Sequence, residues 1–424
     1  MWSIVVTSCK RFQKWGVVVM TENKLHKDTL VIHEGYDDKL HHDSLAVPLY
    51  QTSTYAFDTA KQGENRFAGV EEGPIYSRLG NPTVSVLEDR MTALEGGKGT
   101  LAFGSGMAAV SSILVHLTKT GDHILCSRGI YGCTFGLLST MEEKYNITHD
   151  LVRMGTEEEI ERAIKPETVC IYVETPINPT MELADIQAVV NVAKRHGLRV
   201  VVDNTFSSPY LQNPLTIGVD FVLHSATKYI NGHGDVIAGL LVGNDKEEIE
   251  QIRMSIQKDY GGIISPFDAW LLIRGLKTLS VRMDRHTTNA EKLVNYIKEH
   301  PLVEKTFYPF DKDNPQFDLA KRQMRAGGGL ISFTIKGGIE GAQLFMDSLS
   351  LIKIAVSLGD AETLIQHPAT MTHAVVPEEN RLAMGISNSL LRLSVGLEHA
   401  DDLIKDLADA FEKMEKVIVE QEVQ

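Results

Sequence analysis

Residues 198–206 have the sequence LRVVVDNTF, in which an apolar run stops at an aspartate. Consecutive valines favour a β-strand, and a continuous apolar run is typical of a strand that is buried on both faces. Similar runs occur on either side, VCIYVE at 169–174 and FVLH at 221–224. The segment at about 182–196, between the first two runs, has the periodicity of an amphipathic helix. This alternation predicts an α/β fold with a mainly parallel sheet covered by helices.

Two helices are expected before these strands. The first begins at Asn81, since Asn caps helices well and the proline that follows suits the first helical position, and it ends at Gly96. The second follows the glycine turn at 104–106 and ends before Gly121. Residues 20–80 are rich in turn residues and have little helical periodicity. We therefore expect an extended arm there.

The pattern changes after about residue 275. The signals that follow are a helix at 289–299, a strand in GGGLISFTI at 327–335, apolar runs at 351–359 and 390–398, and a final helix from about Ala400 to Ile418. This mixture is typical of a smaller α+β domain packed against a large one. We expect three parts, namely an N-terminal extension and arm at 1–80, a large domain at 81–275 and a smaller C-terminal α+β domain at 276–424.

The composition excludes several classes of function. The chain has 424 residues and a formal net charge of −14. Nucleic-acid binding needs a basic surface, so this charge argues against a nucleic-acid partner. The four cysteines form no CxxC pair, so no metal site is predicted, and so few cysteines fit a reducing cytoplasm. No apolar run is long enough to span a bilayer, and we expect no membrane partner.

The first twenty residues, MWSIVVTSCKRFQKWGVVVM, make a poor signal peptide. Their apolar pieces are short, and KRFQK splits them. We expect Met20 to be the natural start and residues 1–19 to be an upstream extension without a function of its own.

A lysine lies in the segment HSATKYINGHGD at 224–235, directly after a predicted strand. A lysine that binds a cofactor covalently must be uncharged when it attacks, and a phosphate anchor must lie near it. The hydroxyl groups of Ser225 and Thr227 could supply that anchor beside Lys228. A surface lysine in a glycine-rich loop would have the same pattern, so this segment alone leaves both interpretations open.

Two further segments agree with a cofactor that carries a phosphate. Asp203 ends a buried strand, where an acid is costly unless it is paired, and a protonated ring nitrogen is a suitable partner. An aspartate that caps the following turn is equally compatible with this position. In AFGSGMAAV, at 102–110, small residues precede a helix whose N-terminal amides could bind the phosphate. Glycine turns before helices are common, so this motif is weak by itself.

Taken together, the motifs resemble the Cys/Met-metabolism family of pyridoxal-phosphate (PLP) enzymes. The matching segments are YSRLGNPT at 76–83, FGSGMAA at 103–109, YGCT at 131–134, ETPINPT at 174–180, VVDNTF at 201–206, SATKYINGHGD at 225–235, SLGDAETLIQHPATMTH at 357–373 and LLRLSVGLE at 390–398. The resemblance implies PLP-dependent transferase fold type I, which is aspartate-aminotransferase-like, with PLP bound by the large domain. It also implies a homotetramer, a dimer of dimers with shared active sites.

The resemblance gives several residues a place around the cofactor. It implies that Lys228 carries PLP as a Schiff base and that Asp203 pairs with the ring nitrogen. Tyr131 would lie over the ring, and Asn178 would lie beside its 3′ oxygen. The remaining cofactor-binding residues are expected to hold the phosphate, namely Ser225, Thr227, Gly106 and Met107 of the same chain, with Tyr76 and Arg78 of the neighbouring subunit.

The implied substrate is a sulfur-containing amino acid. Arg392, with Ser357, resembles the clamp on the α-carboxylate, and a guanidinium fork suits a carboxylate. Lys228 would remove the Cα proton, and Tyr131 would protonate the leaving thiolate. Tyr131 should then have a lowered pKa, which cationic neighbours such as Arg78 could provide.

Three features favour one reaction within the family. Cys133 and the pair Lys258-Asp259 resemble methionine γ-lyases, and we include Cys133 among the expected catalytic residues. Val356 stands where relatives that use cystathionine typically have a glutamate, and an apolar residue suits a thiomethyl tail. These features predict α,γ-elimination of L-methionine, and of related amino acids such as homocysteine, to 2-oxobutanoate, ammonia and methanethiol. Cystathionine or homocysteine γ-lyase, O-acetylhomoserine sulfhydrylase and cystathionine γ-synthase remain alternatives.

Overall fold

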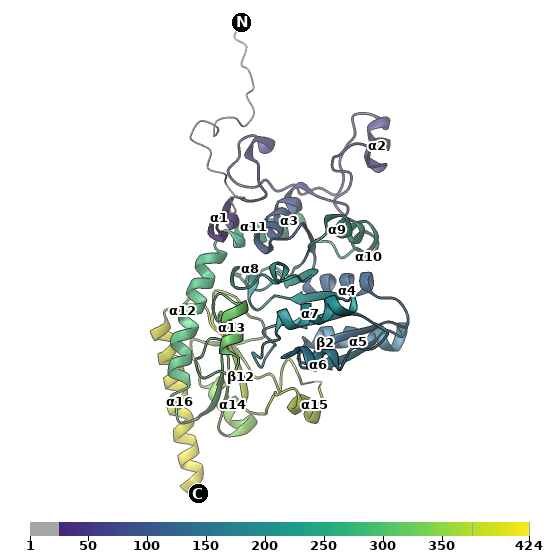
Figure 1. Ribbon diagram of the computed structural model, residues 1–424. Helices are drawn as coiled ribbons and strands as arrows, with labels where there is room; N and C mark the ends of the chain where they lie inside the picture. Colours follow the sequence, from purple (N-terminus) through teal and green to yellow (C-terminus); the bar gives the residue numbers. More distant parts are fainter. Residues whose placement is uncertain (1–24, 375, 424) are drawn as a thin grey trace, which may run out of the picture.

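The computed structural model describes residues 25–374 and 376–423. The expected upstream extension at residues 1–19, with Met20 as the natural start, lies outside the described residues. Within them, no helix combines the length and the apolar character needed to cross a bilayer. Two β-sheets, each with its own helices, make up most of the molecule (Figure 1).

The larger sheet has seven strands in the order β1-β7-β6-β5-β4-β2-β3, and only β7 runs against the others. The strands are β1 (Gly99–Phe103), β2 (His123–Ser127), β3 (Thr148–Val152), β4 (Thr168–Glu174), β5 (Arg199–Asp203), β6 (Phe221–Ser225) and β7 (Gly239–Gly243). The three strands predicted from apolar runs are β4, β5 and β6, and each predicted end lies within one residue of the observed end. Because these strands are parallel, their carboxyl ends lie along one edge of the sheet.

Helices surround this sheet on both faces. They are α3 (Pro82–Glu95), α4 (Gly106–Leu117), α5 (Gly132–Tyr145), α6 (Glu157–Glu161), α7 (Ile186–His196), α8 (Ser208–Leu211), η2 (Pro214–Ile217), α9 (Lys246–Ile252), η3 (Arg253–Gln257), α10 (Lys258–Tyr260) and α11 (Pro266–Leu276). On β5, Val201 packs in one cluster with α4 and α5, whereas Val200 and Val202 pack in another with α7. This burial on both faces explains why the strand is apolar at consecutive positions.

Helix α3 begins and ends where the sequence predicts. The Asn81 side chain accepts a hydrogen bond from the Thr83 amide at 2.9 Å. Gly96 adopts a φ of 71°, the left-handed conformation that commonly follows the last residue of a helix. Helix α7 begins at Ile186, later than the expected start near residue 182, because Asp185 is its N-cap.

The smaller sheet has five strands in the order β10-β11-β12-β9-β8. Its strands and helices are α12 (Leu279–Ile297), β8 (Val303–Phe307), α13 (Phe317–Gln323), β9 (Leu330–Ile335), α14 (Gly338–Asp347), β10 (Lys353–Ile354), β11 (Leu364–Gln366), α15 (Glu378–Ala383), β12 (Leu390–Ser394) and α16 (Ala400–Val423). Helices α12 and α16 lie side by side (Figure 1) and share a buried apolar cluster with β9 and β12. The predicted helix at 289–299 is the second half of α12, and the apolar run at 351–359 forms only β10 before it leaves the sheet.

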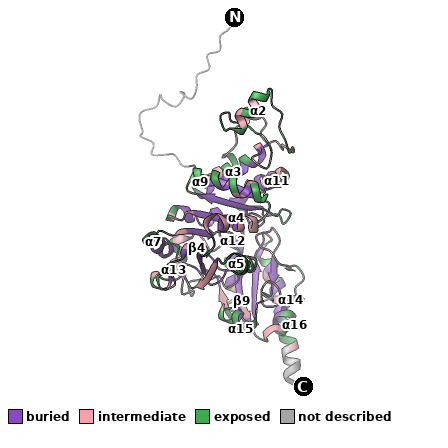
Figure 2. Cartoon of the chain, turned by 90° about the vertical axis from the view of Figure 1, so that its right-hand side faces the viewer, coloured by how far each residue is buried: buried purple, intermediate pink, exposed green. Residues whose placement is uncertain are grey.

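The N-terminal arm contains more helix than the sequence indicates. Its helices are α1 (Lys27–His33), η1 (Asp38–His41) and α2 (Ala60–Phe67). Helices this short have too few residues to show a clear periodicity, which is why the expectation of an extended segment was wrong here. Helix α2 projects from the body (Figure 1), and only Gly63 of it is buried (Figure 2). The division of the chain at residues 80 and 275 stays a prediction.

Candidate active site

A cavity of about 380 Å³ lies at the carboxyl ends of β4, β5 and β6. Residues from the smaller sheet, including Arg392 on β12, close its other side. Ligands of open α/β sheets typically bind outside this edge. Ten of the predicted site residues line the cavity, namely Gly106, Met107, Tyr131, Asn178, Asp203, Ser225, Thr227, Lys228, Ser357 and Arg392.

Lys228 lies in the loop between β6 and β7, where it is only partly exposed. Its Nζ donates a hydrogen bond to Ser357 Oγ at 3.0 Å. Burial, followed by the nearby Arg392 guanidinium, lowers the pKa of Lys228 from its ordinary value, and Asp360 opposes this shift. A lower pKa increases the fraction of uncharged amine, which is the form that attacks a carbonyl carbon.

Asp203, the last residue of β5, presents its carboxylate to the cavity without an ion-pair partner among the described residues. Its Oδ1 accepts a hydrogen bond from the Thr205 amide at 3.0 Å, and its Oδ2 accepts one from the Tyr172 hydroxyl at 3.4 Å. Burial raises the pKa of Asp203, while the hydrogen bonds from Thr205 and the nearby His224 lower it. A desolvated carboxylate without a counter-charge is costly, so this position fits a cationic group such as a protonated pyridine nitrogen.

The N-terminus of α4 offers an anion site at the same cavity. Ser105 caps an amide of the first turn through its hydroxyl at 3.0 Å, and the amides of Gly106 and Met107 are left without an intrahelical partner. A Cβ at Gly106 would lie 3.1 Å from the Ser225 Cβ, so glycine keeps this space open. The Thr227 hydroxyl already accepts a hydrogen bond at 3.0 Å from the amide of Ala238, the residue before β7. The cavity thus combines the Lys228 amine, the Asp203 carboxylate and an anion site, which fit the aldehyde, the ring nitrogen and the phosphate of PLP.

A buried arginine stands on the smaller-sheet side of the cavity. Arg392 is 3% exposed; its Nη1 donates to Asn178 Oδ1 at 2.8 Å, and its Nη2 donates to the Ser357 carbonyl at 2.6 Å. The Arg392 Nε has no hydrogen-bond partner among the described residues. Ser357 has a φ of 114°, and strained backbone of this kind clusters at functional sites. The guanidinium therefore has a donor left for an anion such as a carboxylate.

Tyr131 immediately precedes α5, lines the cavity and is 42% exposed. A hydrogen bond with Cys133, followed by burial, raises the pKa of Tyr131 to about 12, and the nearby Glu174 adds to this shift. The direction is opposite to the predicted lowering. Within one chain Arg78 does not provide that lowering, because its Nη1 donates instead to the Lys258 carbonyl at 2.9 Å. Tyr131 is thus protonated at neutral pH and is able to donate a proton.

Three predicted site residues lie outside the cavity wall. Tyr76 is 41% exposed in the loop before α3, and the Arg78 guanidinium lies 5.4 Å from the centre of its ring. Cys133, in the first turn of α5, is exposed and lies two positions after Tyr131, whose pKa it raises. The predicted contact of Tyr76 and Arg78 with a neighbouring subunit agrees with this position and stays a prediction.

Glu174 is a site residue that the sequence reasoning missed. It ends β4, is 5% exposed and lies beside Asp203 in the parallel pairing of β4 with β5. Its Oε2 accepts from the Tyr131 amide at 2.8 Å, and its Oε1 accepts from the Asn178 amide at 3.4 Å. Burial, followed by the charge of Asp203, raises the pKa of Glu174 to about 8. An acid at the end of an apolar strand is the signal that identified Asp203, and it could have identified Glu174 as well.

Replacing Glu174 with glutamine is expected to flatten the pH dependence of stability of the cofactor-free protein. The pKa of this carboxyl group rises from 4.5 to about 8 on folding. The folded state therefore binds the proton more tightly, and the stabilisation present below pH 4.5 is lost as the pH rises towards 8. Thermal unfolding at about pH 6 and about pH 9 should show a fall in Tm that is smaller for Glu174→Gln than for the wild type. An equal fall in both proteins would contradict this account of Glu174.

Among solved structures, the chain resembles a cystathionine γ-lyase from Lactobacillus plantarum that is complexed with L-serine. The TM-score is 0.87 and the sequence identity 41%, over 92% of this chain and 100% of that one. This likeness, together with the mainly parallel sheet, confirms the predicted PLP-dependent transferase fold type I.

Comparisons of sequence agree with the structural likeness. The L-methionine γ-lyase of Treponema denticola is 48% identical over 388 residues, which cover 91% of this chain and 96% of that protein. The cystathionine γ-lyase of Bacillus subtilis is 43% identical over 390 residues, which cover 92% of this chain and 100% of that protein. The family model described as "Cys/Met metabolism PLP-dependent enzyme" matches residues 28–412, which confirms the predicted cofactor. The chain therefore belongs to the Cys/Met metabolism family of PLP-dependent enzymes.

Proposed function

We propose that this protein cleaves the carbon–sulfur bond of L-methionine, and of related amino acids such as homocysteine, by α,γ-elimination. Methionine and water would give methanethiol, 2-oxobutanoate and ammonia. The observation that carries the proposal is the arrangement around Ser357. Lys228 Nζ bonds to its hydroxyl at 3.0 Å and Arg392 Nη2 to its carbonyl at 2.6 Å, so the amine proposed to hold the cofactor and a carboxylate-binding group meet at one residue. An α-amino acid, which carries its amine and carboxylate on one carbon, matches this arrangement.

The role of each residue follows from its position. When bound, PLP supplies an aldehyde that bonds to amines and a ring that accepts electrons from the substrate Cα. Asp203 would pair with the ring nitrogen, and the N-terminus of α4 with Ser225 would hold the phosphate. Arg392 binds the α-carboxylate and so orients Cα. Lys228 Nζ moves the protons of Cα and Cβ, and Tyr131 Oη donates a proton to the leaving sulfur.

The substrate side chain is expected to lie towards Val356. This residue precedes Ser357, lines the cavity and is 57% exposed. An apolar residue there suits an uncharged thioether better than the charged end of cystathionine. The similarity to L-methionine γ-lyases supports this choice, and the similarity to cystathionine γ-lyases makes cleavage of cystathionine or homocysteine the second candidate.

Product analysis with parallel substrates distinguishes the candidates. The purified protein would receive L-methionine, homocysteine, cystathionine, or O-acetylhomoserine with sulfide, and thiols, 2-oxobutanoate and ammonia would be quantified. We expect L-methionine to have the largest kcat/KM and to give methanethiol and 2-oxobutanoate in equal amounts. A larger kcat/KM for cystathionine would support the second candidate. Synthesis of homocysteine from O-acetylhomoserine without any cleavage of methionine would instead indicate a transferase and overturn the proposal.

Tyr131→Phe is expected to lower kcat for L-methionine about 10²–10³-fold, within the range typical of general acid catalysis. Methanethiolate leaves poorly without a proton, whereas acetate leaves readily. The loss should therefore be much smaller for elimination of acetate from O-acetylhomoserine. The measurement is steady-state kinetics with both substrates, and equal losses would show that Tyr131 is not the proton donor to sulfur.

We further propose that the protein is a cytoplasmic homotetramer, a dimer of dimers with shared active sites. Tyr76 and Arg78 lie outside their own cavity, where they are available to that of a neighbour. The arm also exposes large apolar side chains, as interfaces do: Leu40 (75%), Leu45 (88%), Phe67 (70%) and Val70 (77%). The free cysteines of the described residues fit a reducing compartment. Light scattering should give four times the chain mass of 47.0 kDa, and a monomer would contradict the proposal.

A further inference from the structure

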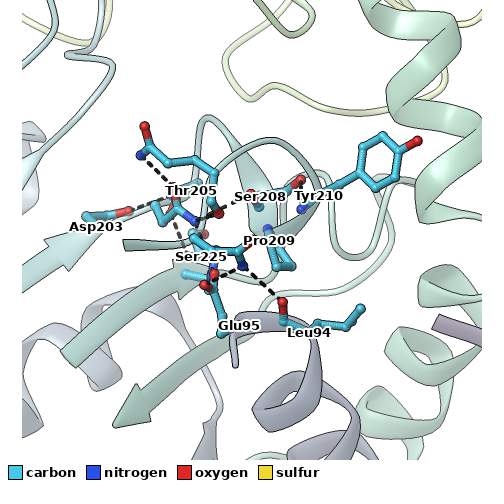
Figure 3. Close-up of polar contacts among 12 residues, drawn as sticks. Leu94, Glu95, Asp203, Thr205, Ser208, Pro209, Tyr210 and Ser225 are labelled. Carbon is cyan, nitrogen blue, oxygen red and sulfur yellow. Dashed lines mark hydrogen bonds and ion pairs between the residues drawn. The ribbon is translucent and has the colours of Figure 1, made fainter. Parts of the chain in front are cut away.

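A buried polar cluster centres on Glu95, the last residue of α3, which is 0% exposed (Figure 3). Its Oε1 accepts hydrogen bonds from His224 Nε2 at 2.6 Å and from Asn204 Nδ2 at 3.1 Å. Its Oε2 accepts one from Asn213 Nδ2 at 3.1 Å, and the Lys27 ammonium of α1 bonds to Asn213 Oδ1. Both oxygens of this buried carboxylate thus accept hydrogen bonds from side chains.

Two of the three residues that bond to the Glu95 carboxylate are sequence neighbours of cofactor-site residues. Asn204 follows Asp203 at the end of β5, and His224 precedes Ser225 at the end of β6. One carboxylate oxygen therefore joins the ends of the two strands. The regular pairing of β5 with β6 stops at Asp203. Beyond it the Asn204 amide donates to the Leu223 carbonyl at 2.9 Å, and the side-chain bonds of Glu95 add to this backbone link.

A second link joins the same two strand ends at the cavity. The Thr205 amide donates to Asp203 Oδ1 at 3.0 Å, and the Thr205 hydroxyl accepts from the Ser225 amide at 2.8 Å. In Figure 3, Glu95, Asp203, Thr205 and Ser225 lie in one group of side chains that dashed lines join. Two separate sets of hydrogen bonds, one through Glu95 and one through Thr205, therefore fix the position of Asp203 relative to Ser225.

Stability alone does not explain this choice of residues. A buried hydrogen-bonded pair of polar side chains is often no more stabilising than apolar side chains of the same shape, because both polar groups lose their hydration. The need to fix the ends of β5 and β6 explains these residues better, since hydrogen bonds of defined geometry determine where the two strand ends lie. The nearby His224 also opposes the rise that burial causes in the pKa of Asp203.

We propose that Glu95 and His224 are positioning residues, which hold the ends of β5 and β6 so that Asp203 and Ser225 meet the cofactor in one fixed arrangement. The proposal rests on the cofactor-binding roles given above. Neither residue takes part in the chemistry. They act through Asn204 and through the backbone of the two strands.

Glu95→Gln and His224→Asn in the full-length holoenzyme test this proposal. Each variant should raise the dissociation constant of PLP and lower kcat, both by about 10–100-fold, the size typical of partners that orient ligand residues. The KM for L-methionine should stay within about twofold, because Arg392 and Ser357 come from the smaller-sheet side. The double variant should lose less than the product of the two single effects, because the residues act as one unit. The measurements are equilibrium dialysis of PLP, its absorbance spectrum when bound, and steady-state kinetics.

Glu88→Gln is a matched control on the same helix. Glu88 is also buried, pairs with Arg253 at 2.9 Å and accepts from the Ala102 amide at 2.9 Å. Within the described residues its side chain forms no hydrogen bond with β5 or β6. We expect this variant to lose thermal stability while it keeps the wild-type dissociation constant of PLP.

Three results would overturn the proposal. They are wild-type PLP binding in both test variants, an equal weakening in the Glu88→Gln control, and a rise of KM that matches the fall of kcat. If Glu95→Gln does not fold, the dissociation constant of PLP in His224→Asn tests the proposal, because His224 is the hydrogen-bond partner of Glu95. Because dialysis measures PLP binding directly, the test stands even if the wild type cleaves a different amino acid.

Discussion

Lys228→Ala is expected to lower kcat for L-methionine by at least about 10⁴-fold, the upper end of the range for loss of one acid–base group. The residue has two proposed tasks, covalent attachment of PLP and proton transfer at Cα and Cβ. Its Nζ lies at the cavity, 3.0 Å from Ser357 Oγ, and burial lowers its pKa towards the uncharged form that both tasks need. No other lysine lines the cavity of the described chain. The measurement is release of 2-oxobutanoate from methionine.

A matched control separates this effect from a general loss of folded protein. Lys246 is exposed in the first turn of α9 and does not line the cavity. Lys246→Ala should therefore keep the wild-type kcat. Lys228→Ala should also unfold at a Tm close to that of the wild type when both proteins are compared without cofactor. Retention of a tenth or more of the wild-type activity in Lys228→Ala would contradict the proposed roles of Lys228.

Asp203→Ala is expected to lower kcat about 10²–10³-fold, which corresponds to about 3–4 kcal/mol of transition-state stabilisation. The carboxylate has no ion-pair partner among the described residues, and its proposed partner is the ring nitrogen of PLP. Without that charge the ring nitrogen loses its proton, and the ring accepts electrons from Cα less well. The affinity for PLP should fall as well.

The matched variant Asp203→Glu keeps the charge but displaces it by one methylene. We expect it to recover part of the lost kcat, whereas Asp203→Asn should resemble the alanine variant in kcat. Steady-state kinetics at saturating PLP measures the effect on kcat apart from the effect on affinity. If all three variants had wild-type kcat under these conditions, Asp203 would not be the partner of the ring nitrogen.

The central strands were predictable because burial on both faces leaves a strong local signal. Runs of valine and isoleucine identified β4, β5 and β6. The acid and the lysine that follow these strands could also be placed, since parallel strands end at one edge of a sheet. The helices of the arm could not, because seven or eight residues held by caps and local turns give little periodicity.

The contacts of Arg392 were beyond the reach of sequence spacing. Arg392 forms hydrogen bonds with Asn178, which is 214 positions away in the sequence, and with Ser357, which is 35 positions away. The fold of the smaller sheet brings Ser357 to Arg392, and the packing of that sheet against the larger one brings both to Asn178. The resemblance to a known family implied that these three residues lie at one site, and the structure gives the hydrogen bonds that join them.

The pKa of Tyr131 shows where residue types alone give the wrong sign. A tyrosine in a cationic pocket would have a lowered pKa. In the structure a hydrogen bond with Cys133, burial and the neighbouring Glu174 raise it to about 12. Glu174 acts from the end of a strand 43 positions away, so its influence depends on the pairing of the sheet.

Peptide mapping of the attached cofactor tests the account most directly. The holoenzyme would be reduced with borohydride, which fixes PLP to the amine that holds it, then digested and examined by mass spectrometry. We expect one modified peptide, carrying the pyridoxyl group on Lys228. Modification of another lysine, with Lys228 recovered intact from active enzyme, would contradict it.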